Sequence, residues 1–64
     1  MITLNRKDKD GEEYECAVNP AFITSACYIA DSGLTALNMD GQQTIWVTDS
    51  PRIVAIRIEE YNHG

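Results

Sequence analysis

Residues 34–48 read LTALNMDGQQTIWVT, and this stretch decides the fold. Two runs rich in β-forming residues, 34–39 and 44–48, flank the short loop Asp40-Gly41-Gln42-Gln43. Glycine adopts positive φ without a Cβ clash, so an Asp-Gly pair between two such runs is typical of a β-hairpin. We therefore predict an antiparallel hairpin at this point.

Two further turn signals, Asp10-Gly11 and Ser32-Gly33, divide the rest of the chain. Apolar and polar residues alternate over 2–5 and again over 13–18, as they do in half-buried strands. Residues 23–30 form another β-rich run. Such short strands between regularly spaced turns predict a compact antiparallel sheet.

The sequence Asn19-Pro20-Ala21-Phe22 interrupts this pattern. Proline has no N–H and a fixed φ, so it does not occupy the middle of a paired strand. We predict one turn of the 3₁₀ type, which reverses the chain and places Phe22 or Ile23 in the core.

The segment after Asp49 fits two structures. Ser50 as N-cap and Pro51 at the first helical position favour a helix, with Val54, Ile58 and Tyr61 on one face. However, Val54, Ile56 and Ile58 also alternate with Ala55 and Arg57, and β-branched residues favour strands, which fits a sixth strand. Residues 62–64 are expected to be a frayed tail.

These observations predict a mainly β, small α+β fold. About five short antiparallel strands would form a curled meander or half-barrel, followed by a C-terminal helix or a sixth strand. Because the chain has 64 residues, we expect residues 1–61 to form a single small β-rich domain.

Composition excludes several classes of function. Ten acidic and five basic residues give a formal charge of −5, which argues against nucleic acid as a partner. No apolar run approaches the roughly 20 residues that span a bilayer, so we expect no direct membrane insertion. The first six residues lack the basic and apolar regions of a signal peptide, and we expect a cytoplasmic protein.

No constellation of residues supports catalysis or a cofactor. Asp8 and Asp10 before Gly11 resemble part of a calcium loop, but the bidentate glutamate is missing. Cys16, Cys27 and His63 provide at most three zinc ligands and have no C-x-x-C spacing. We predict no metal, no cofactor, no enzymatic activity and two reduced, buried thiols.

Two aromatic residues and one charged turn are the candidate protein contacts. Trp46 lies between Ile45 and Val47 in its strand, so it points outward, lies under the C-terminal element or is buried in a homo-oligomer. Tyr28 is a second candidate. An acidic hairpin within residues 8–15 offers a patch for a basic partner, through Asp8, Asp10, Glu12 and Glu13. An open sheet also has two edges, and we expect a homo-oligomer.

Five short motifs follow one another in an order that is similar to a known family. They are Met1-Ile2-Thr3-Leu4-Asn5-Arg6, Gly11-Glu12-Glu13-Tyr14, Asn19-Pro20-Ala21-Phe22-Ile23, Leu37-Asn38-Met39-Asp40-Gly41 and Val47-Thr48-Asp49-Ser50. The chain resembles the FlbD/SwrD family of small bacterial flagellar-operon proteins over nearly its full length.

The chain also departs from this family. Residues 7–10 lengthen the first turn, and Ala30-Asp31-Ser32-Gly33 stands where the family has a Thr-Pro-Asp turn. The resemblance implies a non-catalytic accessory factor of flagellar motility that acts through protein contacts. The alternative is a phage or mobile-element protein that oligomerises and binds or sequesters a host protein or a small ligand.

Overall fold

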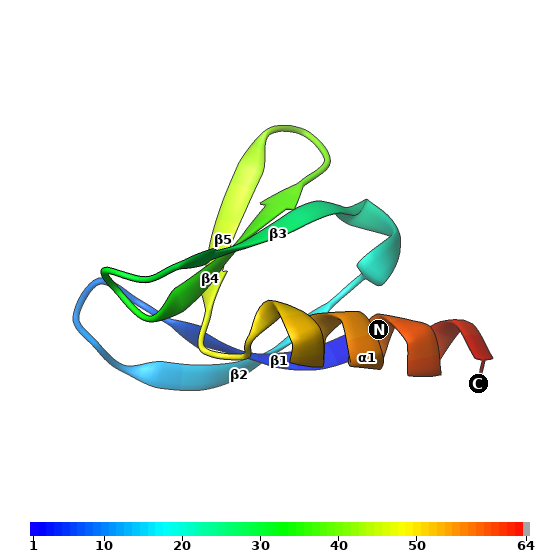
Figure 1. Ribbon diagram of the computed structural model, residues 1–64, viewed down its shortest axis with the longest axis horizontal. Helices are drawn as coiled ribbons and strands as arrows, with labels where there is room; N and C mark the ends of the chain where they lie inside the picture. Colours follow the sequence, from blue (N-terminus) through cyan, green and yellow to red (C-terminus); the bar gives the residue numbers. More distant parts are fainter. Residues whose placement is uncertain (64) are drawn as a thin grey trace.

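The structure is a computed structural model that describes residues 1–63. Its elements follow the order β1 (Ile2–Lys7), β2 (Glu13–Val18), η1 (Pro20–Phe22), β3 (Ile23–Ile29), β4 (Leu34–Met39), β5 (Gln43–Val47) and α1 (Pro51–His63). The expected mainly β fold with five antiparallel strands and a C-terminal helix is confirmed, and the sheet is open (Figure 1).

The strands form one sheet in the order β2-β1-β5-β4-β3. β1 and β2 make one hairpin and β3, β4 and β5 make a meander, as the turn signals predict. The two halves meet where β1 runs antiparallel to β5, with Arg6 opposite Val47. η1 carries the chain from one edge of the sheet to the other, so β2 and β3 are both edge strands (Figure 1).

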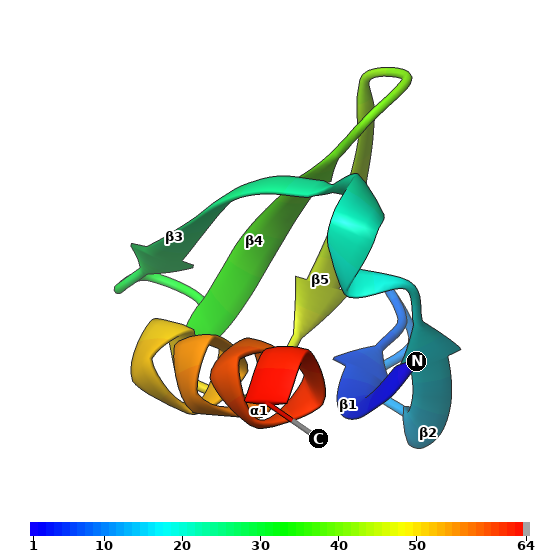
Figure 2. The ribbon, with the colours of Figure 1, turned by 90° about the vertical axis from the view of Figure 1, so that its right-hand side faces the viewer.

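The core lies between α1 and one face of the bent sheet, here called the inner face. Figure 2 shows α1 nearly end-on below β3 and β4, with β1 and β2 beside it. α1 packs against β1 and β3. The six residues of the buried cluster are Ile2, Leu4, Val18, Leu37, Val47 and Val54.

The C-terminal segment is a helix and not a sixth strand. The Ser50 hydroxyl accepts a hydrogen bond from the Ile53 N–H at 3.2 Å, which caps the first turn. Pro51 stands at the first helical position, where its missing N–H costs no hydrogen bond. At the other end, the predicted tail is helical through Asn62 and His63, and Gly64 lies outside the described residues.

The predicted 3₁₀ turn is present, and of the two residues expected in the core it is Ile23 and not Phe22 that packs there. The Asn19 side chain accepts a hydrogen bond from the Ala21 N–H, and Pro20 is buried. Phe22 is 52% exposed, and Ile23 packs against the core only partly buried. Because η1 runs around the end of the sheet, Pro20 and not Phe22 faces inward.

Candidate functional site

Trp46 lies on the face of the sheet that α1 does not cover, here called the outer face. Its neighbours Ile45 and Val47 point inward, and α1 packs on their side. Trp46 stands beside Ala36 on β4, and Ala36 stands beside Cys27 on β3. The indole is 41% exposed. Trp46 therefore points outward in the single chain and does not lie under α1.

A groove of about 410 Å³ lies beside the indole. Three apolar side chains, those of Trp46, Ile29 and Leu34, line it together with Ser32 at the β3–β4 turn. The opposite wall is the end of β1 and the start of its turn, formed by Lys7, Asp8 and Lys9. We call this feature the Trp46 groove. Its floor is apolar and its rim is charged, which is the usual composition of a protein-contact site.

A polar row bounds the apolar part of the outer face. The Asn38 amide donates to the Ser25 hydroxyl at 2.8 Å, and its carbonyl oxygen accepts from the Thr44 hydroxyl at 3.1 Å. These three residues occupy β3, β4 and β5 on the side of Trp46 toward the β4–β5 turn. Apolar contact on this face is therefore confined to the region of the Trp46 groove.

The acidic turn between β1 and β2 has two kinds of carboxylate. Asp8 Oδ1 accepts hydrogen bonds from the N–H groups of Asp10 and Glu12, at 2.9 and 3.0 Å, so this side chain organises the turn. Gly11 completes the turn with φ +86°. The side chains of Asp10, Glu12 and Glu13 are exposed and available to a partner.

Tyr28 does not belong to the same site as Trp46. It pairs with Thr35, which pairs with Val47, and this row lies on the inner face. Its side chain is 57% exposed at the margin of the sheet. The structure therefore joins Trp46 to Asp8 and its turn but separates Tyr28 from them by the thickness of the sheet.

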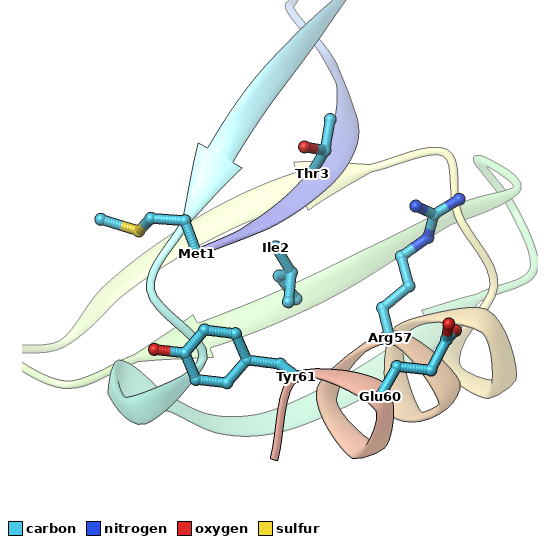
Figure 3. A pocket seen from close by; sticks show the side chains of 6 residues that line it. All are labelled: Met1, Ile2, Thr3, Arg57, Glu60 and Tyr61. Carbon is cyan, nitrogen blue, oxygen red and sulfur yellow. The ribbon is translucent and has the colours of Figure 1, made fainter. Parts of the chain in front are cut away.

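A second hollow, of about 280 Å³, lies between the start of β1 and the last turns of α1. Figure 3 shows the Arg57 and Glu60 side chains on one side of it and the Tyr61 ring on the other, near Met1. The hollow contains one carboxylate and one guanidinium but no nucleophile paired with a base.

The cysteines differ from the expectation of two buried thiols. Cys27 is exposed because it lies on the outer face of an edge strand, where no second layer covers it. Cys16 is partly buried and packs against the core, as its alternation with glutamates indicates. Within residues 1–63, His, Cys, Asp and Glu side chains do not gather in threes around a possible metal position.

Residues 1–63 contain no helix with the length and apolar character needed to cross a bilayer.

Sequence reasoning missed five residues of the Trp46 groove: Lys7, Lys9, Ile29, Ser32 and Leu34. The signal that leads to Ile29 and Leu34 is the hairpin register, because both flank the β3–β4 turn on the outer face. The signal for the lysines is weaker. It requires the pairing of β1 with β5, which joins segments about 40 residues apart and leaves no local pattern in the sequence.

No protein-family model, curated protein or solved structure matches this chain.

Proposed function

We propose that this protein is a non-catalytic protein-interaction module that docks its partner in the Trp46 groove. The observation that carries the proposal is the position of Trp46, 41% exposed between apolar neighbours and a charged turn. A tryptophan costs little conformational entropy when it is immobilised and buries a large apolar area, so it is a frequent anchor of protein interfaces.

Charge specifies the kind of partner. The β1–β2 turn next to the groove ends in the exposed carboxylates of Asp10, Glu12 and Glu13, and the whole chain carries −5. A partner that places an apolar side chain in the groove and basic side chains near this turn would satisfy both features. The acidic residues would then raise the rate of association more than the affinity.

The resemblance to the FlbD/SwrD family extends the proposal to the process. It supports an accessory role in flagellar motility, with a cytoplasmic protein of the flagellar base or motor as the partner. The alternative partner is a host protein sequestered by a phage-encoded or mobile-element protein.

The experiment is a capture of proteins from the native host by three tagged forms: wild type, Trp46→Ala and Tyr61→Ala. Tyr61 is the matched control, since it is an exposed aromatic residue at 49% on another part of the molecule. A true partner binds wild type and Tyr61→Ala, is lost from Trp46→Ala, and binds the purified protein directly. The circular dichroism of all three forms must agree.

The identity of that protein decides between the two biological roles. A flagellar basal-body or motor protein supports the motility proposal, and an unrelated host enzyme or defence protein contradicts it. If Trp46→Ala retains the same proteins as wild type, the groove is not the docking site. Slower association at high salt, with the dissociation rate unchanged, would support the role of the acidic turn.

A further inference from the structure

The two edges of the sheet differ in charge. β2 carries Glu13 and Glu15, which protect an edge from pairing with another chain. β3 is the opposite edge, and residues 20–30 contain no Asp, Glu, Lys or Arg. An uncharged edge strand with unpaired backbone groups is a template for strand addition.

We infer that β3 is the site at which two copies of this chain pair, antiparallel and about a twofold axis. The register follows from a bulge at Thr24, where the pairing with β4 shifts between Ile23 and Ser25. The regular part of the edge is therefore 25–29. When residues 25–29 of one copy pair along their full length with residues 25–29 of the other, the twofold axis passes through the middle residue, Cys27. Ala26 then lies opposite Tyr28 of the second copy.

The inner face offers a cavity for that tyrosine. A groove of about 230 Å³ separates β3 from α1 and has an almost wholly apolar lining that includes Ala26, Ala55 and Ile58. Tyr28 is on the same face of β3 and is 57% exposed. In the twofold register, Tyr28 of each copy stands beside Ala26 of the other, at the mouth of this groove. The contact is reciprocal, as a twofold interface requires.

The exposed area is consistent with a missing neighbour. The chain exposes 4484 Å². A folded monomer of its mass is expected to expose about 4,100 Å². The excess of about 400 Å² is roughly half of the 800 Å² that a standard interface removes from each partner. Pairing at β3 also brings no charged residue of the strand against its own copy, although each chain carries −5.

This inference goes beyond the proposed function, because it concerns the β3 edge and not the Trp46 groove. The two surfaces are nevertheless continuous on the outer face, since Ile29 of β3 also lines the Trp46 groove. A dimer would therefore present two such grooves on one ten-stranded sheet, and a partner with two matching sites would bind it with increased avidity.

The test is the mass of the purified protein in solution, measured by sedimentation equilibrium over a range of concentrations. We expect twice the chain mass of 7.1 kDa at high concentration. Ala55→Arg places a long charged side chain in the groove at an exposed position of α1, and should weaken dimerisation roughly 30-fold or more, as Tyr28→Ala should. Ile56→Arg is the matched control, because it makes the same charge change at the next exposed residue outside the groove.

Cysteine oxidation tests the register. Two Cys27 residues paired directly across the axis would have Cα atoms about 4.5–5.5 Å apart, within the range of a disulfide. With an added oxidant that takes two electrons and two protons from the thiol pair, Cys16→Ser should cross-link rapidly through Cys27. Cys27→Ser, which keeps Cys16 on β2, should not.

Four results would overturn the inference. One is a monomer mass at every concentration. Another is a dimer that Ala55→Arg and Ile56→Arg weaken equally, or that Trp46→Ala abolishes while Tyr28→Ala does not. The last is equal cross-linking through both cysteines, which would indicate random collision. The loss of dimer without loss of partner capture would separate this inference from the proposed function.

Discussion

The carboxylate of Asp49 accepts a hydrogen bond from the backbone N–H of Asn5 at 2.8 Å, across 44 residues of sequence. The carbonyl oxygen of Asn5 accepts from the Thr48 N–H, also at 2.8 Å. Both backbone groups of Asn5 are thus bonded to the segment between β5 and α1. This contact joins the β1–β2 hairpin to the rest of the fold, at a junction whose strand pairing is short.

Replacing Asp49 should therefore separate the two halves more easily. Asp49→Ala leaves the partly buried Asn5 N–H without its acceptor, and we expect a loss of about 1.5–3 kcal/mol in the free energy of unfolding. Asp49→Asn keeps an acceptor oxygen at the same position and should lose less. Urea unfolding followed by tryptophan fluorescence measures both. Equal losses for the two variants would show that the charge, and not the acceptor, is important.

Thr35 stabilises the same junction from β4. Its side chain is 1% exposed, and its hydroxyl donates to the Asp49 carbonyl at 2.7 Å. Thr35→Val keeps the shape but removes the donor, and we expect a loss of about 1–3 kcal/mol because the carbonyl loses its partner. Thr35→Ser keeps the hydroxyl and loses one methyl group, about 0.8 kcal/mol by transfer. A larger loss for Ser than for Val in urea unfolding would contradict this account.

The elements that the sequence predicts well are those encoded by neighbouring residues. Asp40-Gly41 closes the β4–β5 hairpin as expected, with φ +86° at the glycine. Ser50 and Pro51 decide the helix over the strand, since the cap forms at the first turn. Local hydrogen bonds and backbone preferences determine both features, so a short window of sequence contains the information.

The candidate site was less predictable because it depends on contacts between distant segments. Trp46 has no local signal for its face, and the covering of Ile45 and Val47 by α1 decides it. The sequence predicts Asp8 as a partner contact, but its carboxylate accepts hydrogen bonds from two N–H groups of its own turn. The separation of Tyr28 from Trp46 follows from the register of β3, β4 and β5 together.

A single buried residue fixes much of α1 to the sheet. Val54 is 1% exposed and belongs to the core cluster, whereas its neighbour Ile53 is 39% exposed. Val54→Ala removes buried apolar volume and should cost about 1.5–3 kcal/mol, a large share of what so small a core supplies.

Ile53→Ala is the control on the same helix. It should change the free energy of unfolding by less than about 0.5 kcal/mol, because the residue is exposed and alanine favours helix. Thermal unfolding monitored by circular dichroism compares the two variants. Because alanine favours helix at both positions, a comparable loss for both would mean that Ile53 contributes as much packing as Val54 and would contradict this account.

Two adjacent residues of the β4–β5 turn have positive φ, and this backbone conformation is strained at Gln42 but not at Gly41. Gln42 has φ +68° and Gly41 has φ +86°, with open space where a Cβ on Gly41 would lie. Positive φ costs an ordinary residue roughly 1–2 kcal/mol, and asparagine tolerates it better than glutamine. Gln42→Asn should therefore raise the free energy of unfolding by about 0.5 kcal/mol, and Gly41→Ala should lower it by about 1–2 kcal/mol. Since neither side chain enters the core, thermal midpoints that move in the same direction for both variants would show that the strain does not limit the stability of this turn.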